Sequence, residues 1–433
     1  MNYLAYNALL ALASPALAAG LAYRLVTGKS RAGWRQRWGN LPDDLARKSA
    51  PRIWVHCASV GEVTAATPIL RAYRRIRPGD EIVLSVVTPG GFDTASKLGD
   101  LLRCVVYAPF DVPWAVRRAL RRIQPDVLVV LETELWPNLL HLTAARGAAP
   151  ILVNGRISDR SFGRYRRARR IFIWALAHFE RILTQSEVDA RRFEQIGAPA
   201  DRIEVFGNSK FDQAGDRLSA AEVAALRADL RLPPTGPVWV VGSTREPDEE
   251  RIVLEAYRLA RRRAPDLSMV HAPRHPDRAA EVERLYREAG FSPVRRTALS
   301  GVDGPVRELI LDTFGELGRV YAVGDVAFIG NSLTPPGGGQ NLLQPLAQGT
   351  PVVTGPYMQN FRDITAMAQS VGLSYTVRTA QELAEQVLTR LDAQSKASVA
   401  DRAHALIQAN SGASARYAEA IAALAGREGG TRT

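Results

Sequence analysis

The feature that most constrains the fold of this chain is a repeated alternation of short apolar segments with amphipathic ones, which begins near Arg52. Strands that are apolar on both faces and alternate with helices form a parallel sheet that helices cover on both sides. The sequence therefore predicts an α/β fold. The strands expected in the first series are Ile53–Ala58, Glu81–Thr88, Asp126–Leu131, Ile151–Asn154, Arg181–Thr184 and Ile203–Phe206.

The alternation stops at a segment that contains Pro and Gly, Arg231–Pro237, and then starts again. A chain of 433 residues also exceeds what one hydrophobic core usually supports. We therefore expect two Rossmann-like domains, 29–213 and 214–395, linked near Phe211–Pro237 and facing a ligand cleft at the carboxyl ends of their strands. A helical tail, 396–433, follows. The strands expected in the second domain are Val238–Ser243, Leu267–Ala272, Leu309–Asp312, Asp325–Gly330 and Thr350–Thr354.

Residues 1–28 precede both domains and are mostly apolar. Residues 3–23 carry no charged side chain, and Arg24, Lys29 and Arg31 follow at once. A secretory signal has its positive charge before the apolar stretch, so this order predicts a retained membrane anchor. The segment is rich in Ala and contains Pro15, so both a bilayer span and an interfacial helix stay open, as does a buried N-terminal helix. The positive-inside rule keeps the remainder on the cytoplasmic face of the membrane.

The charge balance is basic, because 56 Lys and Arg residues against 44 Asp and Glu give a net charge of +12. Such a surface favours anionic partners, such as the head groups of an inner-membrane surface. We expect no nucleic-acid partner, because no binding motif or interleaved aromatic residues accompany the basic clusters. The oligomeric state stays open. The clusters are Arg117, Arg118, Arg121 and Arg122; Arg164, Arg166, Arg167, Arg169 and Arg170; and Arg261–Arg263.

Charged side chains follow strands of the first domain. Glu62 falls in the first turn of a helix after a strand, where the helix dipole favours the carboxylate that a general base needs. Glu132 and Glu134 stand at the end of another strand, in a stretch otherwise free of charge. Lys210 ends the domain and is suited to stabilise negative charge. The alternatives are an ordinary acidic residue in a helix first turn, a capping carboxylate and a salt bridge.

In the second domain the candidate ligand contacts follow strands too. The segment Gly337–Gly339 joins a strand to a helix, where glycine lets the backbone approach a phosphate; a tight turn is the alternative. Arg274 is suited to a bidentate phosphate contact, and Gly315–Gly318 opens a helix. The chain has no P-loop, no Gly-x-Gly-x-x-Gly and no Cys/His cluster at ligand spacing. Their absence argues against an ATPase, a dehydrogenase and a metal-dependent transferase.

Together these segments resemble the bacterial transferases of 3-deoxy-D-manno-octulosonic acid (Kdo), which act on the lipid A precursor at the inner membrane. The match covers nearly the whole chain in the right order. It rests on Arg35-Gln36-Arg37-Trp38-Gly39, Ser59-Val60-Gly61-Glu62, Glu132-Thr133-Glu134-Leu135-Trp136-Pro137-Asn138, Ser209-Lys210-Phe211-Asp212, Pro273-Arg274-His275-Pro276, Gly315-Glu316-Leu317 and Gly338-Gly339-Gln340-Asn341.

The resemblance implies a two-domain glycosyltransferase of the GT-B type that uses CMP-Kdo as donor and inverts the anomeric carbon. It implies neither a bound metal nor a cofactor. By position, Glu62 would be the base that deprotonates the acceptor, and Glu132 and Lys210 would stabilise the transition state. The residues that would hold CMP are Pro273, Arg274, Gly315, Glu316, Leu317, Asn341, Leu342, Leu343 and Gln344.

The chain departs from the family pattern on the donor side. Gln340 and Gln344 stand where the family usually has His and Glu, and Arg245 stands where it has His. Glutamine keeps hydrogen-bonding capacity but lacks the carboxylate. The main hypothesis is Kdo transfer to a lipid A precursor (lipid IVA) in lipopolysaccharide synthesis. The alternatives are a related enzyme with another nucleotide-sugar donor and a non-catalytic protein that binds lipid A.

Overall fold

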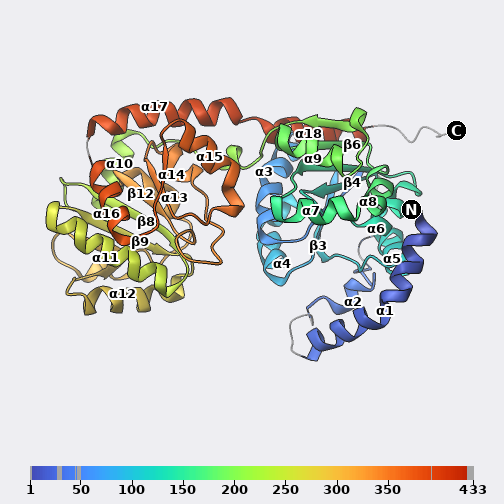
Figure 1. Cartoon of the computed structure of the whole chain (residues 1–433), viewed down its shortest axis with the longest axis horizontal. Coiled ribbons are helices and arrows are strands. Elements are labelled where there is room, and N and C mark those ends of the chain that lie inside the picture. Colours follow the sequence, from blue (N-terminus) through green and yellow to red (C-terminus); the bar gives the residue numbers. More distant parts are fainter. Residues whose placement is uncertain (1, 27–31, 44, 46–49, 392, 427–433) are drawn as a thin grey trace. The chain divides into compact units, whose positions relative to one another are not determined.

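The computed structural model describes all residues except 1, 27–31, 44, 46–49, 392 and 427–433. The chain divides into two compact units, each built on its own parallel sheet (Figure 1). The first unit contains Met1–Asp212 and Asn410–Thr433, and the second contains Gln213–Ala409. The expectation of two parallel-sheet α/β domains is thereby confirmed.

The first unit has a seven-stranded parallel sheet in the order β3-β2-β1-β4-β5-β6-β7. The chain order reverses at β1 and β4, which are paired with His56 opposite Val130. Ligands of open α/β sheets bind beyond the carboxyl ends of strands at such a reversal. The strands are β1 (Arg52–Cys57), β2 (Glu81–Val86), β3 (Cys104–Tyr107), β4 (Val127–Leu131), β5 (Ala149–Gly155), β6 (Arg181–Thr184) and β7 (Ile203–Val205).

Helices cover both faces of this sheet, as strands that are buried on both faces require. One face packs against α3, α4 and α18, and the other against α5, α6, α8 and α9. The helices are α1 (Tyr3–Val26), α2 (Trp34–Arg37), α3 (Val60–Ile76), α4 (Pro89–Ser96), α5 (Pro113–Ile123), α6 (Pro137–Ala144), α7 (Asp159–Arg167), α8 (Arg169–Leu176), α9 (Glu187–Gln195) and α18 (Ala413–Ala425), with 3-10 turns η1 (Gly99–Leu101), η2 (Ala200–Arg202) and η3 (Phe211–Gln213).

The second unit repeats the plan with a seven-stranded parallel sheet in the order β10-β11-β9-β8-β12-β13-β14. Its chain order reverses between β8 and β12, where Val241 lies opposite Phe328. The strands are β8 (Val238–Thr244), β9 (Ser268–Pro273), β10 (Val294–Arg295), β11 (Glu308–Ile310), β12 (Val326–Ile329), β13 (Val352–Thr354) and β14 (Ser374–Thr376).

The helices of the second unit include one, α10, inside the segment that the sequence suggested as a linker. The expected tail divides between the units, since α17 lies in the second and α18 in the first. The helices are α10 (Ala220–Asp229), α11 (Pro247–Arg263), α12 (Ala279–Glu288), α13 (Leu317–Val320), α14 (Leu343–Ala347), α15 (Arg362–Ser370), α16 (Ala380–Thr389) and α17 (Ala393–Asn410), with 3-10 turns η4 (Pro276–Arg278), η5 (Arg296–Gly301), η6 (Tyr321–Val323) and η7 (Gln359–Phe361).

The expected anchor is a helix, α1, whose first turns dock on the first unit. Asn7 and Asn138 exchange two amide hydrogen bonds, of 2.9 and 3.0 Å. The Tyr6 hydroxyl donates to Asp111, which also accepts from the backbone N–H of Asn138. Leucines of the same helix face solvent, with 75% of Leu4, 51% of Leu9 and 79% of Leu12 exposed, so α1 is not a buried core helix. Among the described helices, none is both long and apolar enough to cross a membrane.

The last helix, α18, is held on the first unit by Asp212. The Asp212 carboxylate accepts the backbone N–H groups of Gly412 (2.6 Å) and Ser414 (2.7 Å), which would otherwise lack partners at the helix start. We expect Asp212→Ala to destabilise the protein by about 1–2 kcal/mol, as the loss of a helix cap does. Urea unfolding measures this, with the exposed Asp201→Ala as control. Equal unfolding midpoints for the two variants would contradict the capping role.

Candidate active site

Glu62 lies beyond the carboxyl end of β1, in the first turn of α3. Its Oε2 accepts the backbone N–H of Ala58 (2.7 Å) and its Oε1 accepts the Ser59 hydroxyl (3.1 Å). The residue is 8% exposed. The two hydrogen bonds fix the orientation of the carboxylate, and the remaining exposure leaves it open to a small reacting group.

Glu132 and Glu134 follow β4, the strand next to β1. Glu132 has a left-handed backbone (φ 51°), a conformation that non-glycine residues seldom adopt and that often marks a functional site. Glu134 accepts the indole N–H of Trp136 through Oε2 (2.9 Å). The pairing of β1 with β4 thus brings three glutamates to the same edge of the sheet.

The electrostatics of the three glutamates are coupled. Burial, and after it the charges of Glu134 and Glu132, raise the pKa of Glu62 from an ordinary 4.5 to about 8, although the two hydrogen bonds lower it. Burial also raises the pKa of Glu134, and the negative charge of Glu132 adds to this rise. The same three carboxylates act with burial to raise the pKa of the Cys57 thiol. A carboxylate with a pKa near neutrality is matched to general-base chemistry.

His56, on β1, lies beside this cluster but is not suited to be the base. It is fully buried, and burial lowers its pKa to about 3, so the ring is neutral. Its Nδ1 is 2.9 Å from the Ser85 hydroxyl, and its ring meets that of Trp136 edge to face at 4.6 Å. His56 therefore supports Trp136, which in turn holds Glu134.

The loop that carries Lys210 is fixed to the same region. The Ser209 hydroxyl donates to the backbone carbonyl of Ala65, about one turn beyond Glu62 in α3 (3.0 Å). The Ser209 N–H donates to the Asn154 side chain at the end of β5 (3.2 Å). Sequence reasoning did not single out Asn154. The sequence pattern that could have identified Asn154 is a polar residue at the end of an apolar strand. The positive φ of Asn154, 53°, is visible only in the structure.

The second unit carries the residues expected to hold the nucleotide. Pro273 is the last residue of β9 and is buried, whereas Arg274 directly after it is exposed. The Arg274 N–H donates to the backbone carbonyl of Thr244 (2.7 Å), which fixes the start of this loop beside the end of β8. Within the described residues, no ion pair is recorded for the Arg274 guanidinium, so its donors are free for an anionic ligand.

Two other parts of the expected nucleotide site come together. Gly315, with φ 89°, precedes Glu316 and Leu317 at the start of α13. A side chain at Gly318 would come within 3.7 Å of the Gln344 amide, so this helix start faces Gln344 in α14. Glu316 is paired with Arg296 (3.1 Å). Leu342 and Leu343 are fully buried, and Asn341 accepts the Leu343 N–H (3.0 Å), so only the backbones of the two leucines can reach a ligand.

The glycines at 337–339 have a structural explanation. All three are left-handed, and a Cβ atom on them would collide with Tyr357, Asn360 and Met358 respectively. The N–H groups of Gly338 and Gly339 donate to backbone carbonyls of the protein. The following helix, α14, has five residues and starts only at Leu343. These contacts support the tight turn, which was the alternative for these glycines, and a phosphate contact at this segment stays a prediction.

The three candidate catalytic residues thus lie in the first unit and the nine candidate donor contacts in the second. Within the described ranges, no group of three or more His, Cys, Asp or Glu residues is arranged to hold a metal ion.

Comparisons with known proteins agree with these observations. Residues 32–213 match the family model of 3-deoxy-D-manno-octulosonic-acid transferase (kdotransferase). The chain is 34% identical over 401 residues to the 3-deoxy-D-manno-octulosonic acid transferase of Bordetella pertussis, covering 87% of this chain and 89% of the relative. It is 31% identical over 372 residues to the corresponding transferase of Haemophilus influenzae, covering 85% and 86%.

Solved structures support the fold alone. A glycosyltransferase from Rickettsia africae matches 88% of this chain and all of its own with a TM-score of 0.56 at 13% identity. An Anabaena protein in complex with UDP-glucose matches 86% of this chain and 98% of its own with a TM-score of 0.53 at 17% identity.

Proposed function

The chain belongs to the 3-deoxy-D-manno-octulosonic acid (Kdo) transferase family of glycosyltransferases, and from this we propose that it transfers Kdo from CMP-Kdo to a lipid A precursor such as lipid IVA. The observation that carries the proposal is the glutamate cluster at the carboxyl ends of β1 and β4. This cluster supports the proposal because Glu62, the residue expected to be the base from the family resemblance, is buried and its pKa is raised to about 8.

In the proposed reaction, Glu62 takes the proton of an acceptor hydroxyl. The hydroxyl oxygen forms the new bond to the anomeric carbon of Kdo while the bond from that carbon to the CMP phosphate oxygen breaks. CMP leaves with the electron pair, and attack from the opposite face inverts the carbon. Glycosyl transfer passes through a positively charged sugar, which Glu132 would stabilise, and Lys210 would stabilise the negative charge of the departing phosphate.

The second unit would hold CMP. Arg274 offers a guanidinium fork to the phosphate, and the backbone at Gly315–Leu317 and at Asn341–Gln344 offers N–H and carbonyl groups to the nucleoside. Because Gln344 is neutral, it neither attracts a cation nor repels the donor's carboxylate and phosphate. This departure from the family is the observation behind the second candidate, a related enzyme with another acidic nucleotide-sugar donor.

We place the protein at the cytoplasmic face of the inner membrane. The exposed leucines of α1 would enter the lipid interface, and the arginines of α7 and α8 would face anionic head groups. The segment from 27 to 31, which contains the end of the expected anchor and the basic residues Lys29 and Arg31 after it, lies outside the described residues.

One experiment separates the candidate functions. Membrane and soluble fractions of cells that express the protein are incubated with CMP-Kdo and tetraacylated lipid A precursor, and the lipid products are weighed by mass spectrometry. We expect a mass increase of one or more Kdo units, with the activity in the membrane fraction. Transfer only from another nucleotide sugar would favour the related enzyme. Binding of the lipid without transfer from any donor would show a non-catalytic protein, and activity in the soluble fraction would contradict the membrane placement.

A further inference from the structure

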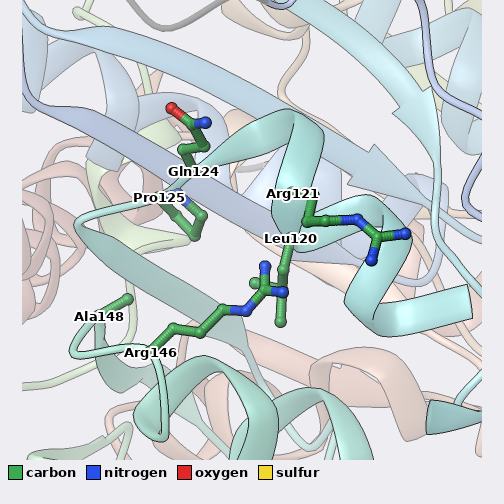
Figure 2. Close-up of a pocket in the computed structure, with 6 residues that line it drawn as sticks. All are labelled: Leu120, Arg121, Gln124, Pro125, Arg146 and Ala148. Carbon is green, nitrogen blue, oxygen red and sulfur yellow. The ribbon is translucent and has the colours of Figure 1, made fainter. Parts of the chain in front are cut away.

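A pocket lies at the amino end of the first sheet, on the opposite edge from the glutamates. It has a volume of about 340 Å³ and is formed by the last turn of α5 with the loop between α6 and β5 (Figure 2). Its residues precede β4 and β5, whereas the glutamates follow β1 and β4. The lining residues are Leu120, Arg121, Gln124, Pro125, Arg146 and Ala148.

The pocket combines an apolar floor with a cationic rim. Leu120 and Ala148 are buried, while Arg121, Gln124 and Arg146 are exposed. Figure 2 shows the Arg146 side chain running from its loop toward Leu120, so that its guanidinium leaves the loop and enters the space beside α5. Partial burial beside this apolar floor reduces the hydration of the Arg146 guanidinium and strengthens its attraction for an anion.

The two arginines that line the pocket have no acidic partner among the described residues. Arg122, outside the pocket, pairs with Asp43 at 2.6 Å. Within the described residues, no ion pair or hydrogen bond is recorded for the guanidiniums of Arg121 and Arg146. Burial and the charges of Arg121 and Arg117 lower the pKa of Arg146, which shows that the arginines repel one another. A bound anion would relieve this repulsion.

The pocket is also close to α1, the helix whose leucines are exposed. Arg117, one turn before Arg121 in α5, donates to the Tyr3 hydroxyl at the start of α1 (3.0 Å). The Tyr3 ring stacks on His141 of α6 at 4.5 Å, about one turn before the loop that carries Arg146. Tyr3 thus contacts α5 one turn before Arg121 and α6 about one turn before the Arg146 loop. The first turn of α1, which carries the exposed Leu4, therefore lies near the pocket.

We propose that Arg121 and Arg146 form a binding site for a phosphate group, supplied either by the head group of an anionic phospholipid or by free phosphate. Each guanidinium group can bind a phosphate through two parallel N–H···O bonds, and both arginines line the pocket. The adjacent α1 favours the lipid source, since one protein edge would then present apolar side chains and phosphate ligands to the same surface. The proposal does not rest on the transfer reaction.

The test compares two double variants of the full-length chain that lose the same charge. Arg121→Gln/Arg146→Gln removes the pocket cations. Arg71→Gln/Arg75→Gln removes two exposed arginines from α3, which packs on the other face of the sheet. Binding to phosphatidylcholine vesicles with and without phosphatidylglycerol is measured by co-sedimentation, and binding of inorganic phosphate is measured by the change in Tm.

We expect the pocket variant to bind phosphatidylglycerol vesicles about tenfold more weakly than wild type, with the α3 variant close to wild type. That result identifies a lipid head-group site. A phosphate-dependent rise in Tm that the pocket variant alone loses, with equal vesicle binding, identifies free phosphate as the ligand. Equal behaviour of the two variants in both assays overturns the proposal, because the arginines would then contribute only general charge.

Discussion

Glu62→Gln is expected to lower the rate of Kdo transfer by about 10²–10⁴-fold, the usual loss when a general base is removed. Glutamine preserves the shape of the side chain: its Oε1 can accept the Ala58 N–H, and its amide can donate to the Ser59 hydroxyl. What it loses is the capacity to take a proton. The prediction is measured as the initial rate of product formation at saturating donor and acceptor.

Two controls separate the loss of a base from other effects. The affinity for CMP, measured by calorimetry, should stay that of wild type, because the proposed nucleotide contacts belong to the second unit. Glu187→Gln, in the first turn of α9, removes a carboxylate at an equivalent place in another helix and should leave the rate unchanged. A Glu62→Gln rate within threefold of wild type would falsify the assignment of the base.

The strands inside both sheets could be predicted from the sequence, whereas of the edge strands only β7 was expected. The expected strands at Ile53, Glu81, Asp126 and Val238 lie within a residue or two of β1, β2, β4 and β8, because each is buried on both faces and reads as one apolar run. The missed strands β3, β10 and β14 are all at sheet edges. β10 and β14 are short and carry polar residues, so they show no continuous apolar pattern, and β3 is an apolar run of only four residues.

From the sequence, candidate site residues could be selected only because they follow predicted strands. Glu62 and Glu132 could be selected because they follow strands, but their proximity depends on the pairing of β1 with β4, which no local pattern encodes. The glycines at 337–339 show the opposite case. Their local pattern suggested a phosphate site, whereas the residues that require glycine there, Tyr357 to Asn360, lie about twenty positions further along the chain.

The coupling of the glutamates predicts an unusual pH dependence. A general base works only as the carboxylate, and the pKa of Glu62 is raised to about 8, mainly by burial and then by the charge of Glu134. The rate should therefore rise with pH through about 8, and below that it should fall roughly tenfold per pH unit. A carboxylate with an ordinary pKa near 4.5 would give a flat profile above pH 6.

Glu134→Gln tests the cause of this pKa, because glutamine can still accept the Trp136 N–H but carries no charge. Removing a neighbouring negative charge favours the ionised form of Glu62, so the acid limb of kcat/KM should move to lower pH. Since burial is the larger cause, the limb should stay above the ordinary pKa of a glutamate. The variant should therefore be faster than wild type at pH 6, by about tenfold for every pH unit through which the limb moves, and similar to wild type well above pH 8.

A uniform loss of rate at every pH would instead mean that Glu134 contacts substrate, and an unmoved limb would mean that another group controls the profile. Glu187→Gln, with the same change of charge away from the cluster, should leave the limb where it is in the wild type.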